Sequence, residues 1–250
     1  APFPDASALF ITPDHYVFRM LYSQGVPLAN LGVPDRLGAP AVDRRSAWRL
    51  FAEHYHLFRG TPSSLWLDAV FHDVFDLRVQ LSADTADTYF DRIAEQLPRT
   101  EFRPRALFDR FGIEVLTTTE SPIDRLEHHA TIRASGWHGR VLTAYRPDPV
   151  VDPEHEDFQD ALDEFATLTG EDTRSWDGYL EAHRRRREYF KRAGATSTDH
   201  GHPTARTCDL TPADCQRLLD HALAGTASPD EAEQFRGQML TEMARMSLAD

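Results

Sequence analysis

Three polar residues, Arg146, Asp199 and His200, follow predicted β-strands at the point where each strand ends. In folds that alternate strands with helices, the residues after the strands gather at one edge of the sheet and carry the chemistry there. A guanidinium at that edge suits the binding of a carboxylate, and an aspartate there can transfer protons. We therefore expect Arg146 to bind an acidic substrate, Asp199 to act as an acid or base, and His200 to contact the ligand.

Each of these residues also has a structural explanation. Arg146 can form a salt bridge with Asp148, Asp199 can cap a turn, and His200 and His202 can make ordinary loop hydrogen bonds. The two histidines lack a third ligand nearby in the sequence, so their spacing is weak evidence for a metal site. Residue types alone give the structural and the chemical explanations about equal weight.

The second half of the chain, residues 112–250, is predicted to alternate strands with helices, which makes the fold class α/β. Three stretches, 113–119, 140–148 and 195–200, each begin as a strand and end in polar residues. Three parallel strands are an incomplete sheet, because a barrel needs about eight strands to close. The pattern favours part of a β/α barrel or of a doubly wound sheet.

The first part of the chain, residues 1–111, is predicted to be mostly helical. Aromatic residues recur at helical spacing in 46–58 and again in 84–97. A further helix is expected to begin near Pro104 and to stop at Gly112, because proline suits a first turn and glycine suits the position after a last turn. Near the start, His15 and Tyr16 form a possible proton-relay pair.

Helix starts in the second region are predicted after Ser121, Thr211 and Ser228, since each of these capping residues is followed by proline. The run Arg184-Arg185-Arg186-Arg187 is predicted to lie on a solvated helix face, because helical charge runs usually face water.

Composition excludes several classes of partner. The net charge of −13 argues against a nucleic-acid backbone or an anionic membrane as partner. No apolar run approaches the roughly 20 residues of a membrane span. Two cysteines, Cys208 and Cys215, are too few for a disulfide framework and fit a reducing compartment. We expect a cytoplasmic protein that acts on a small molecule.

Several segments together resemble the uronate isomerase family, a divergent branch of the amidohydrolase superfamily. The matching segments occur in the family's order: Asp14-His15-Tyr16 with Arg19-Met20, Thr118-Thr119, Pro122-Ile123-Asp124 with Leu126-Glu127-His128-His129, Arg146-Pro147-Asp148, and Asp199-His200. The Pro-Ile-Asp and Leu-Glu-His-His segments are fairly specific when they occur with the Arg-Pro-Asp triplet. The resemblance spans nearly the whole chain.

The resemblance implies a distorted (β/α)8 TIM-type barrel with a mostly helical inserted region, of which the three predicted strands would be the second to fourth. It implies a bacterial enzyme of carbohydrate metabolism that interconverts D-glucuronate with D-fructuronate and D-galacturonate with D-tagaturonate through an enediol. His15, Tyr16 and Asp199 resemble the family's catalytic residues. Arg146, with His200 beside it, resembles the family's substrate-binding residues.

The resemblance also implies a divalent metal, with zinc expected, and leaves open a homo-oligomer. In the family the metal is held by a His-x-His motif on the first strand and an aspartate on the last, and neither falls in this chain. The sequence is therefore expected to be an internal segment of such an enzyme, with no metal ligands of its own. Two alternatives remain at this point: a non-catalytic fragment, and a metal-dependent hydrolase of the same superfamily.

Overall fold

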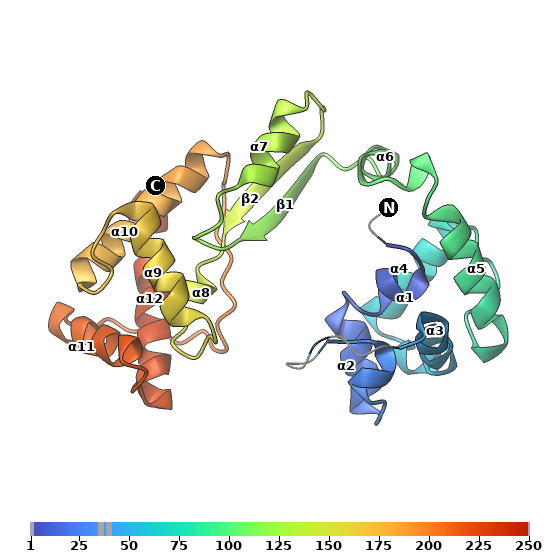
Figure 1. Ribbon diagram of the computed structural model, residues 1–250, viewed down its shortest axis with the longest axis horizontal. Helices are drawn as coiled ribbons and strands as arrows, with labels where there is room; N and C mark the ends of the chain where they lie inside the picture. The colour runs from blue at the N-terminus through green and yellow to red at the C-terminus, as the bar shows by residue number, and fades with distance from the viewer. Residues whose placement is uncertain (1–2, 35–37, 39–41, 250) are drawn as a thin grey trace. The chain divides into compact units, whose positions relative to one another are not determined.

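The computed structural model describes residues 3–34, 38 and 42–249. The chain divides into two compact units, Ala1–Gly112 and Ile113–Asp250, and each has its own elements in Figure 1.

The first unit is built from helices around an aromatic core. Its elements are α1 (Ala6–Phe10), α2 (His15–Ser23), η1 (Leu28–Leu31), α3 (Arg44–Glu53), η2 (Tyr55–Phe58), α4 (Pro62–Ala69), η3 (Val70–Val74), η4 (Ala83–Thr85), α5 (Ala86–Gln96), η5 (Thr100–Phe102) and α6 (Pro104–Arg110). Trp48, Phe51 and Phe71 are almost fully buried. The indole Nε1 of Trp48 donates to the carbonyl of Ala86 at 2.9 Å, which ties α3 to α5.

The helix predicted over 46–58 is interrupted in the structure. The α-helix ends at Glu53 and a short 3₁₀ turn follows. His54 accounts for the break, since its Nδ1 lies 2.8 Å from the carbonyl of Leu50, which competes with the helical bond at that carbonyl. The predicted helix at Pro104 is confirmed.

The second unit contains a small parallel sheet. Strands β1 (Val115–Glu120) and β2 (Arg140–Tyr145) pair in parallel, with Val115 opposite Arg140 and Glu120 opposite Tyr145. The prediction of a third strand over 195–200 was wrong, because within this segment only Thr198 forms a β-bridge, with Tyr145. The chain leaves the sheet after Asp199, and the backbone N–H of Gly201 donates to a carboxylate instead of to a strand.

Helices build the hydrophobic core of the second unit (Figure 1). They are α7 (Glu127–Ala134), α8 (Asp148–Val151), α9 (Phe158–Thr169), α10 (Trp176–Arg192), α11 (Pro212–Leu223) and α12 (Pro229–Ala249). Two of them, α7 and α10, contact β2, whereas β1 is mostly exposed. Phe165, Tyr179 and Phe235 are almost completely buried. The predicted starts of α11 and α12 are confirmed, and the Thr211 side chain accepts from the N–H of Asp214 as the cap requires.

The predicted helix start at Ser121 was wrong, because α7 begins only at Glu127. A turn occupies the preceding residues, and the Asp124 carboxylate accepts from the N–H of Leu126 at 2.6 Å. The guanidinium of Arg186 donates to the carbonyls of Pro122 and Asp124, at 2.7 Å each. Those carbonyls are therefore used by a distant helix and are held in a turn conformation.

The same contacts correct the interpretation of the arginine run. Arg186 and Arg187 are 6% and 5% exposed, whereas Arg184 and Arg185 lie nearer the solvent. The Arg186 guanidinium also lies over the ring of Tyr189, 4.2 Å from its centroid. Only half of the run is therefore a solvated face.

No helix of the described residues is long and apolar enough to cross a membrane.

Candidate active site

Arg146 follows β2 directly and is held by three contacts. Its backbone N–H donates to the carbonyl of Glu120 at 2.9 Å, which continues the sheet by one residue. Its Nε donates to Oδ2 of Asp148 at 2.6 Å, and its Nη1 donates to Oδ2 of Asp199 at 3.0 Å. The predicted neighbours Arg146 and Asp199 are thus in contact, and the predicted salt bridge with Asp148 forms as well. The hydrogen bond with Asp148 is the main cause that raises the pKa of Arg146.

The loop after the Thr198 bridge folds back over this arginine. The N–H of Asp199 donates to the carbonyl of Tyr145 at 3.0 Å, and the N–H of Gly201 donates to Oδ1 of Asp148 at 2.9 Å. A Cβ at Gly201 would lie 2.5 Å from Nη2 of Arg146 and 2.5 Å from Oδ2 of Asp148. A larger residue at 201 would therefore force the ends of the Arg146 and Asp148 side chains to shift.

The two loop histidines are held neutral. Burial is the first cause that lowers the pKa of His200 and that of His202. His200 Nε2 lies 3.2 Å from the hydroxyl of Thr198, while His200 Nδ1 and His202 Nε2 are buried with no hydrogen-bond partner among the described residues. Buried polar atoms normally find a partner. The unpartnered nitrogens beside Asp148 are therefore available to a ligand or to water.

A buried pair lies behind the end of β2. The hydroxyl of Tyr145 lies 2.8 Å from Nδ1 of His183, and both residues are almost fully buried. Burial lowers the pKa of His183 to about 3 and raises the pKa of Tyr145. With His183 neutral at physiological pH, this pair fixes the strand end that carries Arg146.

The sequence predicted a polar cluster at the end of β1 but missed its central residue, Glu120. Glu120 accepts from the hydroxyl of Thr118 at 2.6 Å and from the hydroxyl of Thr143. The Thr118 hydroxyl also lies 3.0 Å from Nε2 of His129, which is buried. The rule that singled out Arg146, a polar residue at a strand end, applies equally to Glu120 and could have found it.

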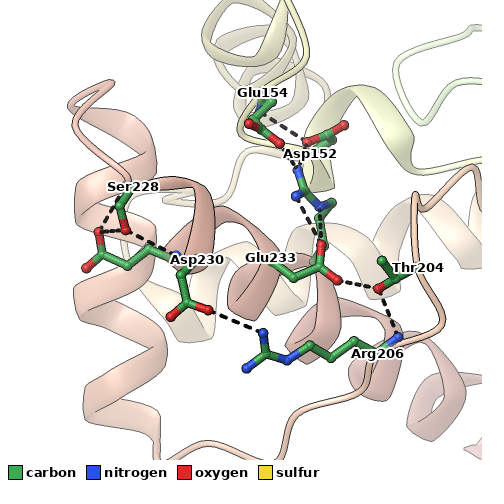
Figure 2. A network of polar contacts seen from close by, with 9 residues as sticks. Asp152, Glu154, Thr204, Arg206, Ser228, Asp230 and Glu233 are labelled. Carbon is green, nitrogen blue, oxygen red and sulfur yellow. Dashed lines mark hydrogen bonds and ion pairs between the residues drawn. The ribbon is translucent and has the colours of Figure 1, made fainter.

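A second ion cluster anchors the far side of the loop. Figure 2 shows Asp152, Glu154 and Glu233 around one guanidinium, which belongs to Arg236. Arg236 Nη1 lies 2.6 Å from Asp152 and 2.7 Å from Glu154, and Glu233 accepts from the hydroxyl of Thr204. The chain that follows Asp199 and His200 is thus attached at two points, at Gly201 to Asp148 and at Thr204 to Glu233.

His15 and Tyr16 open α2 in the first unit. Their ring centroids lie 4.2 Å apart with the ring planes tilted by 33°, and Tyr16 is 61% exposed. The Asp14 carboxylate caps the helix by accepting from the N–H groups of Tyr16 and Val17. The contacts described above join Arg146 with Asp199, and His200 with Thr198.

Within the described part of the chain, no group of three or more His, Cys, Asp or Glu side chains is placed to hold a metal ion. The residues present therefore do not form the metal site that the family resemblance implies. A cavity of about 730 Å³ runs along α10 and α12 beside Arg185 and Glu242, and it contains none of the candidate residues.

Comparison with known proteins decides the family. The sequence profile described as glucuronate isomerase matches residues 1–249. The chain belongs to the glucuronate isomerase family. It is 65% identical over 251 residues to a uronate isomerase of Xanthomonas axonopodis pv. citri, and 63% identical over 250 residues to one of Phenylobacterium zucineum. Both matches cover 100% of this chain and 53% and 52% of the relative, so the chain spans about half the length of these relatives.

Solved structures agree with this assignment. The crystal structure of glucuronate isomerase from Caulobacter crescentus matches with a TM-score of 0.92 and 57% identity, covering 100% of this chain and 52% of that one. A uronate isomerase from Thermotoga maritima shares the fold, with a TM-score of 0.85 at 23% identity, over 100% of this chain and 53% of that one.

Proposed function

We propose that the protein is an isomerase that interconverts aldose and ketose hexuronates, D-glucuronate with D-fructuronate and D-galacturonate with D-tagaturonate. The observation that carries the proposal is family membership over the whole chain, at up to 65% identity to the two relatives above, both named uronate isomerase. The metal-dependent hydrolase is disfavoured because these relatives are named as isomerases. Membership in the amidohydrolase superfamily is part of the same proposal.

The contacts around Arg146 suit such a substrate. A hexuronate carries a carboxylate at one end and a carbonyl at the other, and a guanidinium binds a carboxylate through paired hydrogen bonds. Arg146 would fix the acid end, so that the carbonyl end always lies in the same place. Asp199 and the neutral His200 lie beside it for proton transfer and for hydrogen bonds to sugar hydroxyls.

Isomerisation moves one hydrogen between adjacent carbons. A base takes the proton next to the carbonyl, an enediol forms, and the neighbouring carbon is reprotonated. We assign Asp199 to one of these proton transfers and Tyr16, with His15 beside it, to the other. This assignment of Tyr16 rests on the family resemblance alone.

The complete fold is proposed to be a distorted (β/α)8 barrel, in which β1, β2 and the Thr198 segment are the second to fourth strands. The part of the relatives' length that this chain does not span would supply the other strands and the ligands of a divalent metal, expected to be zinc. We also propose a cytoplasmic location and leave a homo-oligomer as an expectation.

The test is substitution of Arg146 in the protein as its gene encodes it, assayed by ketose formation from D-glucuronate and D-galacturonate. Arg146→Lys is expected to raise KM about tenfold or more, because a charged bidentate contact contributes roughly 1.5–3 kcal/mol. Arg245→Lys is the matched control, since Arg245 is also half-exposed and paired with two carboxylates. An unchanged KM for Arg146→Lys removes Arg146 from the site, and no turnover of either hexuronate by the parent protein refutes the function.

A further inference from the structure

The two carboxylates on Arg146 are held very differently. Asp148 is 19% exposed at its side chain, and each of its oxygens has a partner, Arg146 Nε and Gly201 N–H. Asp199 is 45% exposed, and the contact with Arg146 Nη1 is the one hydrogen bond that its side chain makes among the described residues. Asp148 is therefore a fixed partner of the arginine, and Asp199 is a replaceable one.

The charges do not suit an anionic ligand as they stand. Arg146 contributes one positive charge and Asp148 and Asp199 contribute two negative charges, while burial keeps His200 neutral. A carboxylate that approaches Arg146 thus meets a cluster with an excess of negative charge. It must also compete for Nη1, which already donates to Asp199. A guanidinium can offer a paired contact only where its N–H groups are not already used.

We propose that the carboxylate of the substrate displaces Asp199 from Arg146 and so releases Asp199 for proton transfer, while Asp148 and Gly201 hold Arg146 in place throughout. This inference rests on the proposed function. Binding of the sugar carboxylate to Arg146 would thus release Asp199, the residue that transfers the proton in the reaction. It also makes Asp148 a positioning residue, which acts on the substrate only through Arg146.

The proton transfer balances without a further reactant. The freed carboxylate of Asp199 takes the proton next to the carbonyl, and the electron pair of that C–H bond forms the double bond of the enediol. The carbonyl oxygen takes a proton from the second carrier. In the closing half of the reaction the proton on Asp199 returns to the neighbouring carbon, and a hydroxyl proton returns to the carrier.

Substitution of the two aspartates should therefore change ligand binding in opposite directions. The probe is L-gulonate, the alcohol formed by reducing the aldehyde of D-glucuronate, which keeps the carboxylate and cannot isomerise. Asp199→Asn removes the competitor and is expected to tighten L-gulonate binding about two- to fivefold, the range for a partly exposed ion pair. The same variant should lose about a hundredfold or more in kcat. Asp148→Asn is expected to weaken L-gulonate binding about tenfold.

Calorimetric titration of the gene-encoded protein, with its metal retained, gives each Kd directly. Asp209→Asn is the matched control, because Asp209 also pairs with an exposed arginine, Arg245 at 2.7 Å, away from this site. D-glucitol, which lacks the carboxylate, should show no tightening with Asp199→Asn. Tightening of L-gulonate alone supports the exchange.

Two results would overturn the exchange while leaving the isomerase function standing. One is a parent protein that isomerises hexuronates although Asp199→Asn weakens or does not alter L-gulonate binding. The other is equal tightening of L-gulonate and D-glucitol. A parent protein that neither isomerises hexuronates nor binds L-gulonate refutes the function itself, and the exchange with it.

Discussion

Arg236 offers the sharpest test of how the candidate loop is supported. Its side chain is only 6% exposed and meets three carboxylates, those of Asp152, Glu154 and Glu233. In Arg236→Met the methionine side chain occupies much of the same space but carries no charge. The three carboxylates then face one another without a cation between them. Breaking a buried pair costs about 3–5 kcal/mol when the partner stays buried.

The exposure of the three carboxylates decides where in the range of about 3–5 kcal/mol the loss of stability lies. Glu154 is 57% exposed and Asp152 is 28% exposed, so both can regain water, whereas Glu233 is 18% exposed and cannot do so fully. We therefore expect a loss near the lower end, about 3 kcal/mol in the free energy of unfolding. For a unit of about 140 residues this corresponds to a fall of roughly 10 °C in Tm.

The assay is thermal unfolding followed by circular dichroism, with Arg245→Met as the matched control. Arg245 also contacts two carboxylates but is 49% exposed, so its loss should lower Tm by no more than about 3 °C. KM for D-glucuronate should also rise in Arg236→Met. Arg236 holds Glu233, and Glu233 binds Thr204 in the segment that follows Asp199 and His200. Equal shifts in Tm for the two variants would refute the reasoning.

Two further substitutions test the neighbouring structure. Gly201→Ala places a methyl group 2.5 Å from Arg146 Nη2. The methyl group should displace the guanidinium and raise KM for D-glucuronate about tenfold in steady-state kinetics. An unchanged KM would contradict this expectation. His183→Gln tests how stability depends on pH. Burial lowers the pKa of His183 to about 3, so below about pH 6.5 the native state binds fewer protons than the unfolded state. The free energy of unfolding therefore falls as the pH falls. From pH 7 to pH 5 the wild type should lose about 2 kcal/mol more than His183→Gln in urea unfolding. Equal losses in the two proteins would contradict this reasoning.

Local signals were predicted well from the sequence. The Thr211-Pro212 and Ser228-Pro229 pairs carry everything a helix start needs within one turn, and α11 and α12 begin there. The shared position of Arg146 and Asp199 at one edge of the sheet also followed from the strand pattern, because both lie at the ends of neighbouring parallel segments. The chemical roles assigned to these residues, and to His15, Tyr16 and His200, stay predictions.

Structural features that depend on residues far apart in the chain could not be predicted from the sequence. Ser121-Pro122 has the same local pattern as the confirmed caps, yet no helix begins there because Arg186 binds the carbonyls of that segment. The burial of Arg186 and Arg187 was missed for the same reason, since a charge run does not reveal which members find acceptors inside the fold. Asp148 was weighed only as a partner that could compete for Arg146, and its bond to Gly201 depends on a loop 53 residues away.

The bond between Arg186 and the β1–α7 turn also constrains the order of folding during synthesis. Pro122 and Arg186 are 64 residues apart, so the carbonyl of Pro122 leaves the ribosome well before its partner exists. At about 5–20 residues per second, that interval is roughly 3–13 s. During this time β1 and the start of α7 lack the donor that fixes the turn between them. The turn is therefore completed only when α10 has been made and docks, which makes this segment a late event in the folding of the nascent chain.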